Sequence, residues 1–478
     1  MKISEKLNLN KSQFELDFVD IDIEKDIPLF IDSNLIRKYD SEFNARFVDT
    51  MDSFFSYLLN TLSNNLNDKA KYLCSHLSEI NETHLGLSKG VSNGKGVGQI
   101  GALKLFEGLK NSQAIEDGVL KDIEDLRVLV NGFDKDMLSD MLTNILKKHL
   151  LEYTINQCNL LNIKLTPNVP SGFFWNEKTL KWENEYMERL VIDNKPILLV
   201  PKKIVNFKLE GSSSQYRQHF VLNFLQDENI RNETSLVQQR KKSKELFVTK
   251  KDIIKTEEEM NKDYLSNFTM KHPEVLEDFK KAYLSKSNPM NGNMLEDISI
   301  DKICDILIGR LRNIPYGTES ASDFHNIMIG IFELLLYPNL INPKKEKEIN
   351  DGRKRIDICF TNVSEHGFFT YIYEKGNVPC PYLYIECKNY SSDVNNPELD
   401  QLAGRFSIRR GKLGILSCRK IDNEPLFIKR CIDTFKDDNG LIIPITDNDI
   451  IQCLESHQNI SKKFEEILFK KSRTIITG

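Results

Sequence analysis

The stretch "YLYIECKNY" (residues 382–390) begins as an ordinary buried strand and then places Glu386 and Lys388 two positions apart. Side chains alternate between the two faces of a strand, so Glu386 and Lys388 share one face and Cys387 lies on the other. Opposite charges buried at the end of an apolar strand are costly unless other groups compensate them. The pattern therefore indicates either a surface ion pair or two side chains that are kept for chemistry.

The composition is that of a globular chain, with 40% apolar and 28% charged residues among 478. A net charge of −5 argues against a protein that coats nucleic acid indiscriminately, although a local basic groove stays compatible with it. The nine cysteines form no C-x-x-C pair, so neither a zinc site nor a disulfide framework is indicated. No apolar run approaches the ~18 residues of a membrane span, so we expect a cytoplasmic protein without a membrane partner.

Differences in composition and apolar periodicity divide the chain into three parts. Residues 1–230 carry apolar residues at helical spacing, with strands near 170–205, and we expect a recognition or regulatory region there. Residues 231–297 are rich in Lys and Glu and end in "KSNPMNGNMLED", which predicts a solvated helical arm and a linker. Residues 298–478 show sharper helix and strand signals and form the third predicted domain.

The third part predicts an α/β domain packed in two or three layers. A helix begins at Ser320 and stops before Pro338. Asp351-Gly352 predicts a hairpin between a strand near 345–350 and one at 353–360. After the strand at 381–388, a helix is predicted from Asn396 to Gly411, followed by a strand in "KLGILSC".

Two carboxylates converge in this arrangement, Asp357 from the hairpin strand and Glu386 from the next strand. Oxygen ligands of this kind suit a hard divalent cation such as Mg²⁺, with the backbone carbonyl of Cys387 as a third protein ligand. Lys388 would then hold the attacking water and offset negative charge that grows on a phosphate. The spacing by itself is weak, because Asp193-Asn194-Lys195 and Asp278-Phe279-Lys280 also match it.

In these residues the segment resembles the PD-(D/E)XK nuclease superfamily, with Asp357 and Glu386-Cys387-Lys388 at the signature positions and Ile356 where a proline is usual. The resemblance covers roughly residues 320–450. It implies a restriction-endonuclease-like core of a central mixed sheet flanked by helices, in the order helix-strand-strand-strand-helix-strand. It also implies a metal-dependent nuclease that uses Mg²⁺ or Mn²⁺ and cuts DNA in preference to RNA. Stand-alone chains of this build resemble bacterial restriction or anti-phage defence effectors, which is analogy.

Several further positions have either the role that the resemblance implies or an ordinary structural role. Glu333 is the one charge in "IMIGIFELLLYP" and would reach the metal site, or else face outward. Gln401, Arg405 and Arg409 recur every four residues and form one polar stripe. Gln401 followed by Arg405 resembles the Q-x-x-x-Y element of some branches, which implies a catalytic role for Gln401 and phosphate contacts by Arg405 and Arg409, or else the stripe is a solvated helix face.

Basic residues on the hairpin, Arg353 and Arg355 among them, would add backbone affinity for nucleic acid, or else protect a sheet edge. The glycine-rich stretch at 86–101 departs from a P-loop, which makes an ATP-driven machine a poor alternative. The rival function is a non-catalytic nucleic-acid-binding or scaffold protein that retains the fold. Assembly into a homo-oligomer of two or more chains stays open.

Overall fold

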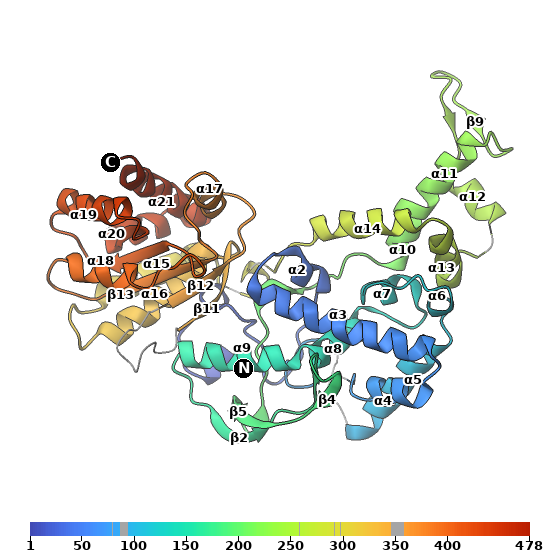
Figure 1. The fold of residues 1–478 in the computed structure, drawn as a ribbon, viewed down its shortest axis with the longest axis horizontal. Helices are drawn as coiled ribbons and strands as arrows, with labels where there is room; N and C mark the ends of the chain where they lie inside the picture. Colours follow the sequence, from blue (N-terminus) through green and yellow to red (C-terminus); the bar gives the residue numbers. More distant parts are fainter. Residues whose placement is uncertain (79, 87–93, 258, 291, 297, 346–357) are drawn as a thin grey trace.

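A computed structural model of the chain describes all residues except 79, 87–93, 258, 291, 297 and 346–357. Its buried apolar side chains form two large clusters. The first draws on residues from Ile3 to Met290, and the second on residues from Ile303 to Ile475 together with Phe14 and Leu160. Figure 1 shows the corresponding parts, a large body with a projecting arm and a sheet wrapped by helices.

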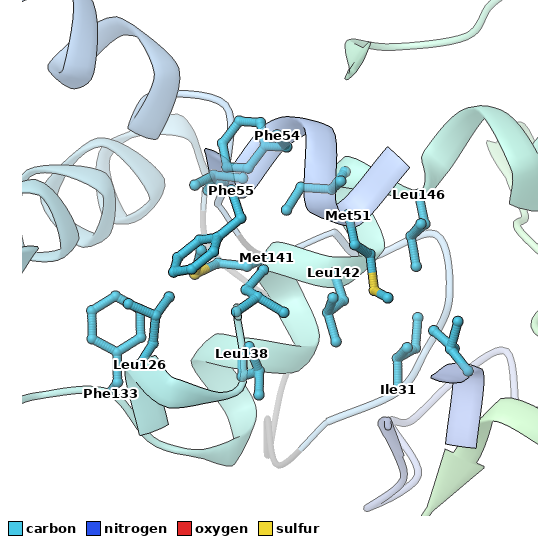
Figure 2. Close-up of a cluster of buried hydrophobic side chains, with 14 of the residues drawn as sticks. Ile31, Met51, Phe54, Phe55, Leu126, Phe133, Leu138, Met141, Leu142 and Leu146 are labelled. Atoms are coloured by element: carbon cyan, nitrogen blue, oxygen red, sulfur yellow. The ribbon is translucent and has the colours of Figure 1, made fainter. Parts of the chain in front are cut away.

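The region before residue 165 is mainly helical, as predicted. Helix α3 (Glu42–Ser63) begins after Ser41, whose side chain accepts a hydrogen bond from the Asn44 amide. Its apolar face, with Met51, Phe54 and Phe55, packs against the helix that carries Met141 and Leu142 (Figure 2). The other helices here are α1 (Ile3–Lys6), α2 (Ser33–Lys38), α4 (Asn67–Cys74), α5 (Gly94–Lys110), α6 (Gln113–Glu116), α7 (Asp125–Leu129), α8 (Lys135–Ile145) and α9 (Lys147–Leu160).

The strands predicted near 170–205 are present as short antiparallel pairs. Trp175 and Trp182 face each other across one of them and are buried against Phe54. The pairs are β2 (Thr166–Pro170) with β5 (Tyr186–Arg189), β3 (Phe174–Asn176) with β4 (Lys181–Glu183), β6 (Val191–Ile192) with β7 (Lys195–Pro196), and β1 (Phe30–Ile31) with β8 (Val205–Asn206).

The charged segment after residue 230 differs from the predicted solvated arm. Helices α13 (Lys262–Lys271) and α14 (Pro273–Lys286) bury Leu265, Phe268 and Phe279 in the first cluster. The apolar residues of each helix lie on one face, so both helices are amphipathic. Their high charge content had suggested a fully solvated segment. What does project is a smaller unit formed by α11 (Leu222–Arg231), β9 (Gln238–Gln239), β10 (Leu246–Phe247) and α12 (Lys250–Thr256), which continues from α10 (Ser213–Tyr216) and a π turn (Arg217–Val221) (Figure 1).

The second cluster surrounds a five-stranded mixed sheet with strand order β11-β12-β13-β14-β15. The first three strands are antiparallel neighbours, and the last two run parallel to β13. The strands are β11 (Leu340–Lys344), β12 (Ile358–Asn362), β13 (Tyr382–Lys388), β14 (Leu413–Cys418) and β15 (Leu441–Thr446). Strand β11 ends at Lys344, and both the strand expected near 345–350, from residue 346 on, and the Asp351-Gly352 turn fall outside the described residues.

Helices pack around this sheet (Figure 1). Helix α16 (Ala321–Leu336) ends before Pro338, as predicted, and α18 (Asn396–Ala403) starts one residue after its Asn395 cap. Helix α18 ends at Ala403, whereas the sequence predicted a helix as far as Gly411. The others are α15 (Ile300–Asn313), α17 (Phe368–Glu374), α19 (Glu424–Lys436), α20 (Asp447–Leu454) and α21 (Ile460–Thr477). In the part of the chain that the structure describes, no helix is both long and apolar enough to cross a membrane.

The two clusters meet at a buried polar junction. Asp17 accepts a hydrogen bond from the Asn342 amide of β11 (3.1 Å) and another from Tyr153 of α9 (2.7 Å). Lys203 donates to the carbonyl of Pro338 (2.7 Å). Because buried charges that lose one partner are destabilising, these pairs fix the first body against the edge of the sheet.

Asp32, which caps α2, predicts a pH dependence of the first body. Its carboxylate accepts from the Asn34 amide (3.0 Å), and burial raises its pKa to about 6 although Arg127 opposes the shift. A raised carboxyl pKa contributes stability below its unfolded value of about 4, and this contribution is lost as the pH rises through 6. An asparagine side chain at this position would keep the cap without the charge. The difference in free energy of unfolding between Asp32→Asn and wild type should therefore shift in favour of the variant by up to about 3 kcal/mol as the pH rises from 4 to 7.5.

Urea unfolding followed by fluorescence measures this effect, because both tryptophans of the chain lie in the first body. Asp134→Asn, which changes an exposed cap of α8, is the matched control. An equal stability difference between Asp32→Asn and wild type at the two pH values would contradict the prediction.

Candidate functional site

Glu386 and Lys388 lie at the carboxyl end of β13, on the face that α18 covers. In the parallel ladder, Tyr384, Glu386 and Lys388 pair with Gly414, Leu416 and Cys418 of β14. A Cβ atom on Gly414 would come within 2.9 Å of the Leu402 side chain, so glycine lets α18 approach the sheet closely. This approach brings Gln401, the neighbour of Leu402, to the end of β13.

Four side chains meet there, three as predicted and one in an unforeseen role. Lys388 Nζ lies 2.8 Å from Glu386 Oε1 and donates to Gln401 Oε1 at 3.1 Å. Gln401 Nε2 donates to Glu386 Oε1 at 2.9 Å, and Arg405 Nη1 donates to Glu386 Oε2 at 2.8 Å. Glu386 is 2% exposed, which makes this a buried, charge-assisted network rather than a surface ion pair.

The position of Arg405 corrects the predicted phosphate-contacting stripe. Because α18 ends at Ala403, residues 404–405 form a turn, and the guanidinium folds in beneath the helix end. Arg405 is 4% exposed and paired with Glu386, whereas Arg409 is exposed in the next turn. Gln401, Arg405 and Arg409 therefore do not share one helix face.

Electrostatically, the described cluster holds two cations and one carboxylate. Nε and Nη2 of Arg405 are buried without a hydrogen-bond partner among the described residues. Buried donors of this kind are usually satisfied by water or an ion.

Glu333 lies elsewhere. It is buried in α16 and forms an ion pair with Lys202 of the first body (2.9 Å). Burial raises the pKa of Glu333 to about 7, while Lys202 favours the ionised form. Its contacts place Glu333 in the polar junction. It therefore fixes the first body against the sheet domain and does not reach the end of β13, contrary to the prediction from the sequence. No local sequence signal predicts this, because Lys202 is 131 residues away.

Three of the predicted residues fall outside the described part of the chain: Asp357, Arg353 and Arg355. Asp357 immediately precedes β12, whose Ile358 pairs with Ile385, the residue before Glu386. Cys387 is half-buried between Glu386 and Lys388 on β13.

A second network that the sequence did not suggest fixes the strand end that bears the site. Asn389 follows Lys388 and donates to the carbonyls of Pro315 and Gly317 (2.9 and 2.8 Å). Arg419, just after β14, donates to Asn389 Oδ1 (2.8 Å) and to Asp447 (2.6 Å). Burial raises the pKa of Asp447 to about 6, although Arg419 opposes the shift. The only sequence signal was a polar residue directly after each of two buried strands.

The donor set at the end of β13 meets part of the needs of a divalent metal ion. The described residues contain no group of three or more His, Cys, Asp or Glu side chains placed to hold one. Mg²⁺ is commonly held by one or two carboxylates together with waters and substrate phosphates. The carboxylate of Glu386, the carbonyl of Cys387 and the carboxylate of Asp357 would meet that requirement, with Asp357 contributed from outside the described residues.

Comparison with known proteins places a match in the other part of the chain. Residues 8–211 match the model of a domain of unknown function, DUF8370. Among curated proteins and solved structures, nothing matches this chain. The matched range supplies Asp17, Tyr153 and Lys202 of the polar junction and ends well before the network around Glu386.

Proposed function

We propose that residues 298–478 form a metal-dependent nuclease domain with a restriction-endonuclease-like fold, acting on DNA in preference to RNA. The observation that carries the proposal is the buried network of Glu386, Lys388 and Gln401 at the carboxyl end of β13. These are the residues that the resemblance to the PD-(D/E)XK superfamily assigns to catalysis. They come from a strand and from the helix that follows it.

The order of elements adds support. Helix α16, strands β11 to β13, helix α18 and strand β14 follow the order helix-strand-strand-strand-helix-strand. The departures are the inserted helix α17 between β12 and β13 and the pairing of Glu333 with Lys202. Both lie outside the network around Glu386.

Each residue of the network has a chemical task in this proposal. A bound Mg²⁺ or Mn²⁺ would polarise the phosphate and lower the pKa of a bound water. Glu386, the Cys387 carbonyl and Asp357 would hold the ion. Lys388 would orient the attacking water and offset charge that develops on the phosphate, and Gln401 keeps the Lys388 ammonium beside Glu386. Arg405 holds the Glu386 side chain in place from the opposite side.

One observation favours a second candidate, a nucleic-acid-binding protein that retains the fold without catalysis. Both carboxylate oxygens of Glu386 accept hydrogen bonds from protein donors, Oε1 from Gln401 and Oε2 from Arg405. Such an arrangement also suits a purely structural ion-pair network.

Incubation of the purified protein with plasmid, linear and single-stranded DNA and with RNA separates the two candidates. Each substrate is tested with Mg²⁺, Mn²⁺ or a chelator. Metal-dependent cleavage supports the nuclease, and binding without cleavage under every condition supports the second candidate. Restriction or anti-phage defence is the biological setting that we propose for the nuclease.

A further inference from the structure

The projecting unit formed by α11, β9, β10 and α12 ends in a basic hairpin. The hairpin at residues 238–247 contains four Lys or Arg and one Glu, in a chain whose net charge is −5. The turn between β9 and β10 is closed by hydrogen bonds from the Arg240 amide to the Glu245 carbonyl (2.9 Å) and from the Lys244 amide to the Arg240 carbonyl (3.0 Å). Lys241, Lys242 and Lys244 stand at its tip, exposed.

The three lysines at the tip form no ion pair within the part of the chain that the structure describes. Among the residues that the structure describes, the ion pair formed in this turn joins Arg240 to Glu245 (3.5 Å), and no carboxylate lies within 4.0 Å of Lys241, Lys242 or Lys244. Lys244 has a φ of +55°, a left-handed conformation that favours Gly or Asn. A long cationic side chain therefore occupies a position where backbone geometry favours a small one.

The arm is ordered by its own packing. Val248 and Ile253 are buried at 2% and 1% exposure in the apolar cluster that includes Leu225 of α11. Gln238 of β9 donates to Asp252 of α12 (3.0 Å). The hairpin is thus presented on a packed base, and it lies toward the opposite end of the long axis from β13 (Figure 1).

We propose that the hairpin at residues 238–247 is a contact for the sugar-phosphate backbone of nucleic acid. Lysines at an exposed tip act as point charges without strict geometry, which suits sequence-independent contact with phosphates. A two-stranded ribbon also has the width that the major groove of B-DNA admits. The choice of nucleic acid as the polyanion rests on the proposed function, but binding by the hairpin does not require cleavage.

The test compares three full-length proteins: wild type, the triple variant Lys241→Gln/Lys242→Gln/Lys244→Gln, and the control Lys71→Gln/Lys178→Gln/Lys181→Gln. The control lysines are exposed on the first body. Binding of a fluorescein-labelled 40-base-pair duplex is measured by anisotropy in EDTA between 50 and 300 mM KCl. The assay measures binding and needs no cleavage. Its result can therefore contradict the role of the hairpin without contradicting the proposed nuclease activity, and the reverse.

The hairpin variant should bind at least fivefold more weakly than the control at 100 mM KCl. The slope of log K against log[KCl] should become shallower by about 2–3, close to 0.9 for each phosphate that the variant no longer neutralises. Equal affinity and slope for the two variants would overturn the proposal. Vesicles containing phosphatidylserine provide a second assay: loss of vesicle binding with unchanged DNA binding would assign the hairpin to an anionic membrane surface instead.

Discussion

Lys388→Ala should reduce phosphodiester cleavage by about 10²-fold or more while a divalent ion still binds. The substitution removes the ammonium group that lies 2.8 Å from Glu386 and leaves the oxygen ligands in place. Losses of this size follow removal of a group that stabilises charge in the transition state. A plasmid-nicking assay gives the rate, and calorimetric titration with Mn²⁺ gives the binding.

Two variants control for the change of charge. Lys412→Ala removes a lysine that pairs with Asp438 away from the network (2.7 Å) and should cut at the wild-type rate. Lys388→Arg retains a cation but cannot reproduce the ammonium geometry, so partial activity at most is expected. Cleavage by Lys388→Ala at the wild-type rate would refute the role of this lysine and favour the binding-protein alternative.

Arg405→Ala should lower the free energy of unfolding by about 3 kcal/mol, the lower end of the range for breaking a buried ion pair. The lower end applies because Lys388 and Gln401 still contact Glu386 after the change. In a domain of this size, the loss corresponds to a fall in Tm of roughly 6–12 °C. Differential scanning calorimetry in metal-free buffer measures it.

Arg409→Ala is the matched control, because Arg409 is exposed four residues away and its loss should cost under ~0.5 kcal/mol. The double variant Glu386→Gln/Arg405→Met removes both charges of the pair and should recover much of the lost stability without activity. Equal Tm values for Arg405→Ala and Arg409→Ala would show that the buried pair contributes no stability.

The same contacts also determine how removal of Glu386 should change stability. Two carboxylates near each other would repel, and on the sequence pattern removal of one could raise stability. In the structure, Glu386 accepts hydrogen bonds from Gln401 and Arg405 and lies 2.8 Å from Lys388, so its removal breaks these buried contacts. Glu386→Ala should therefore lose stability as well as activity.

Local patterns predicted much of the sheet domain. Alternation in "YLYIECK" located β13, and the Asn-Pro start of α18 was correct to within one residue. The end of α18 was missed because Gln401, Arg405 and Arg409 keep helical spacing in the sequence. The buried pair between Arg405 and Glu386 is a tertiary contact that overrides that spacing.

Long-range partners could not be predicted. Glu333 stood out as a charge in an apolar helix, but its partner Lys202 belongs to a 3₁₀ turn (Lys202–Ile204) of the first body. Likewise, α13 and α14 looked solvated because their charges outnumber the few apolar residues that pack into the first cluster. In both cases the outcome depends on which part of the folded chain packs against the helix, and the sequence of the helix does not contain this.

Metal-dependent nicking of plasmid DNA by wild type, Glu386→Gln and Asp357→Ala tests the proposed nuclease activity most directly. Glu386→Gln keeps the size of the side chain and removes the charge that would bind the ion. We expect wild type to nick the plasmid in Mg²⁺ or Mn²⁺ and not in EDTA, and neither variant to nick it. Nicking by Glu386→Gln at the wild-type rate, or by wild type in EDTA, would contradict the proposed metal-dependent mechanism.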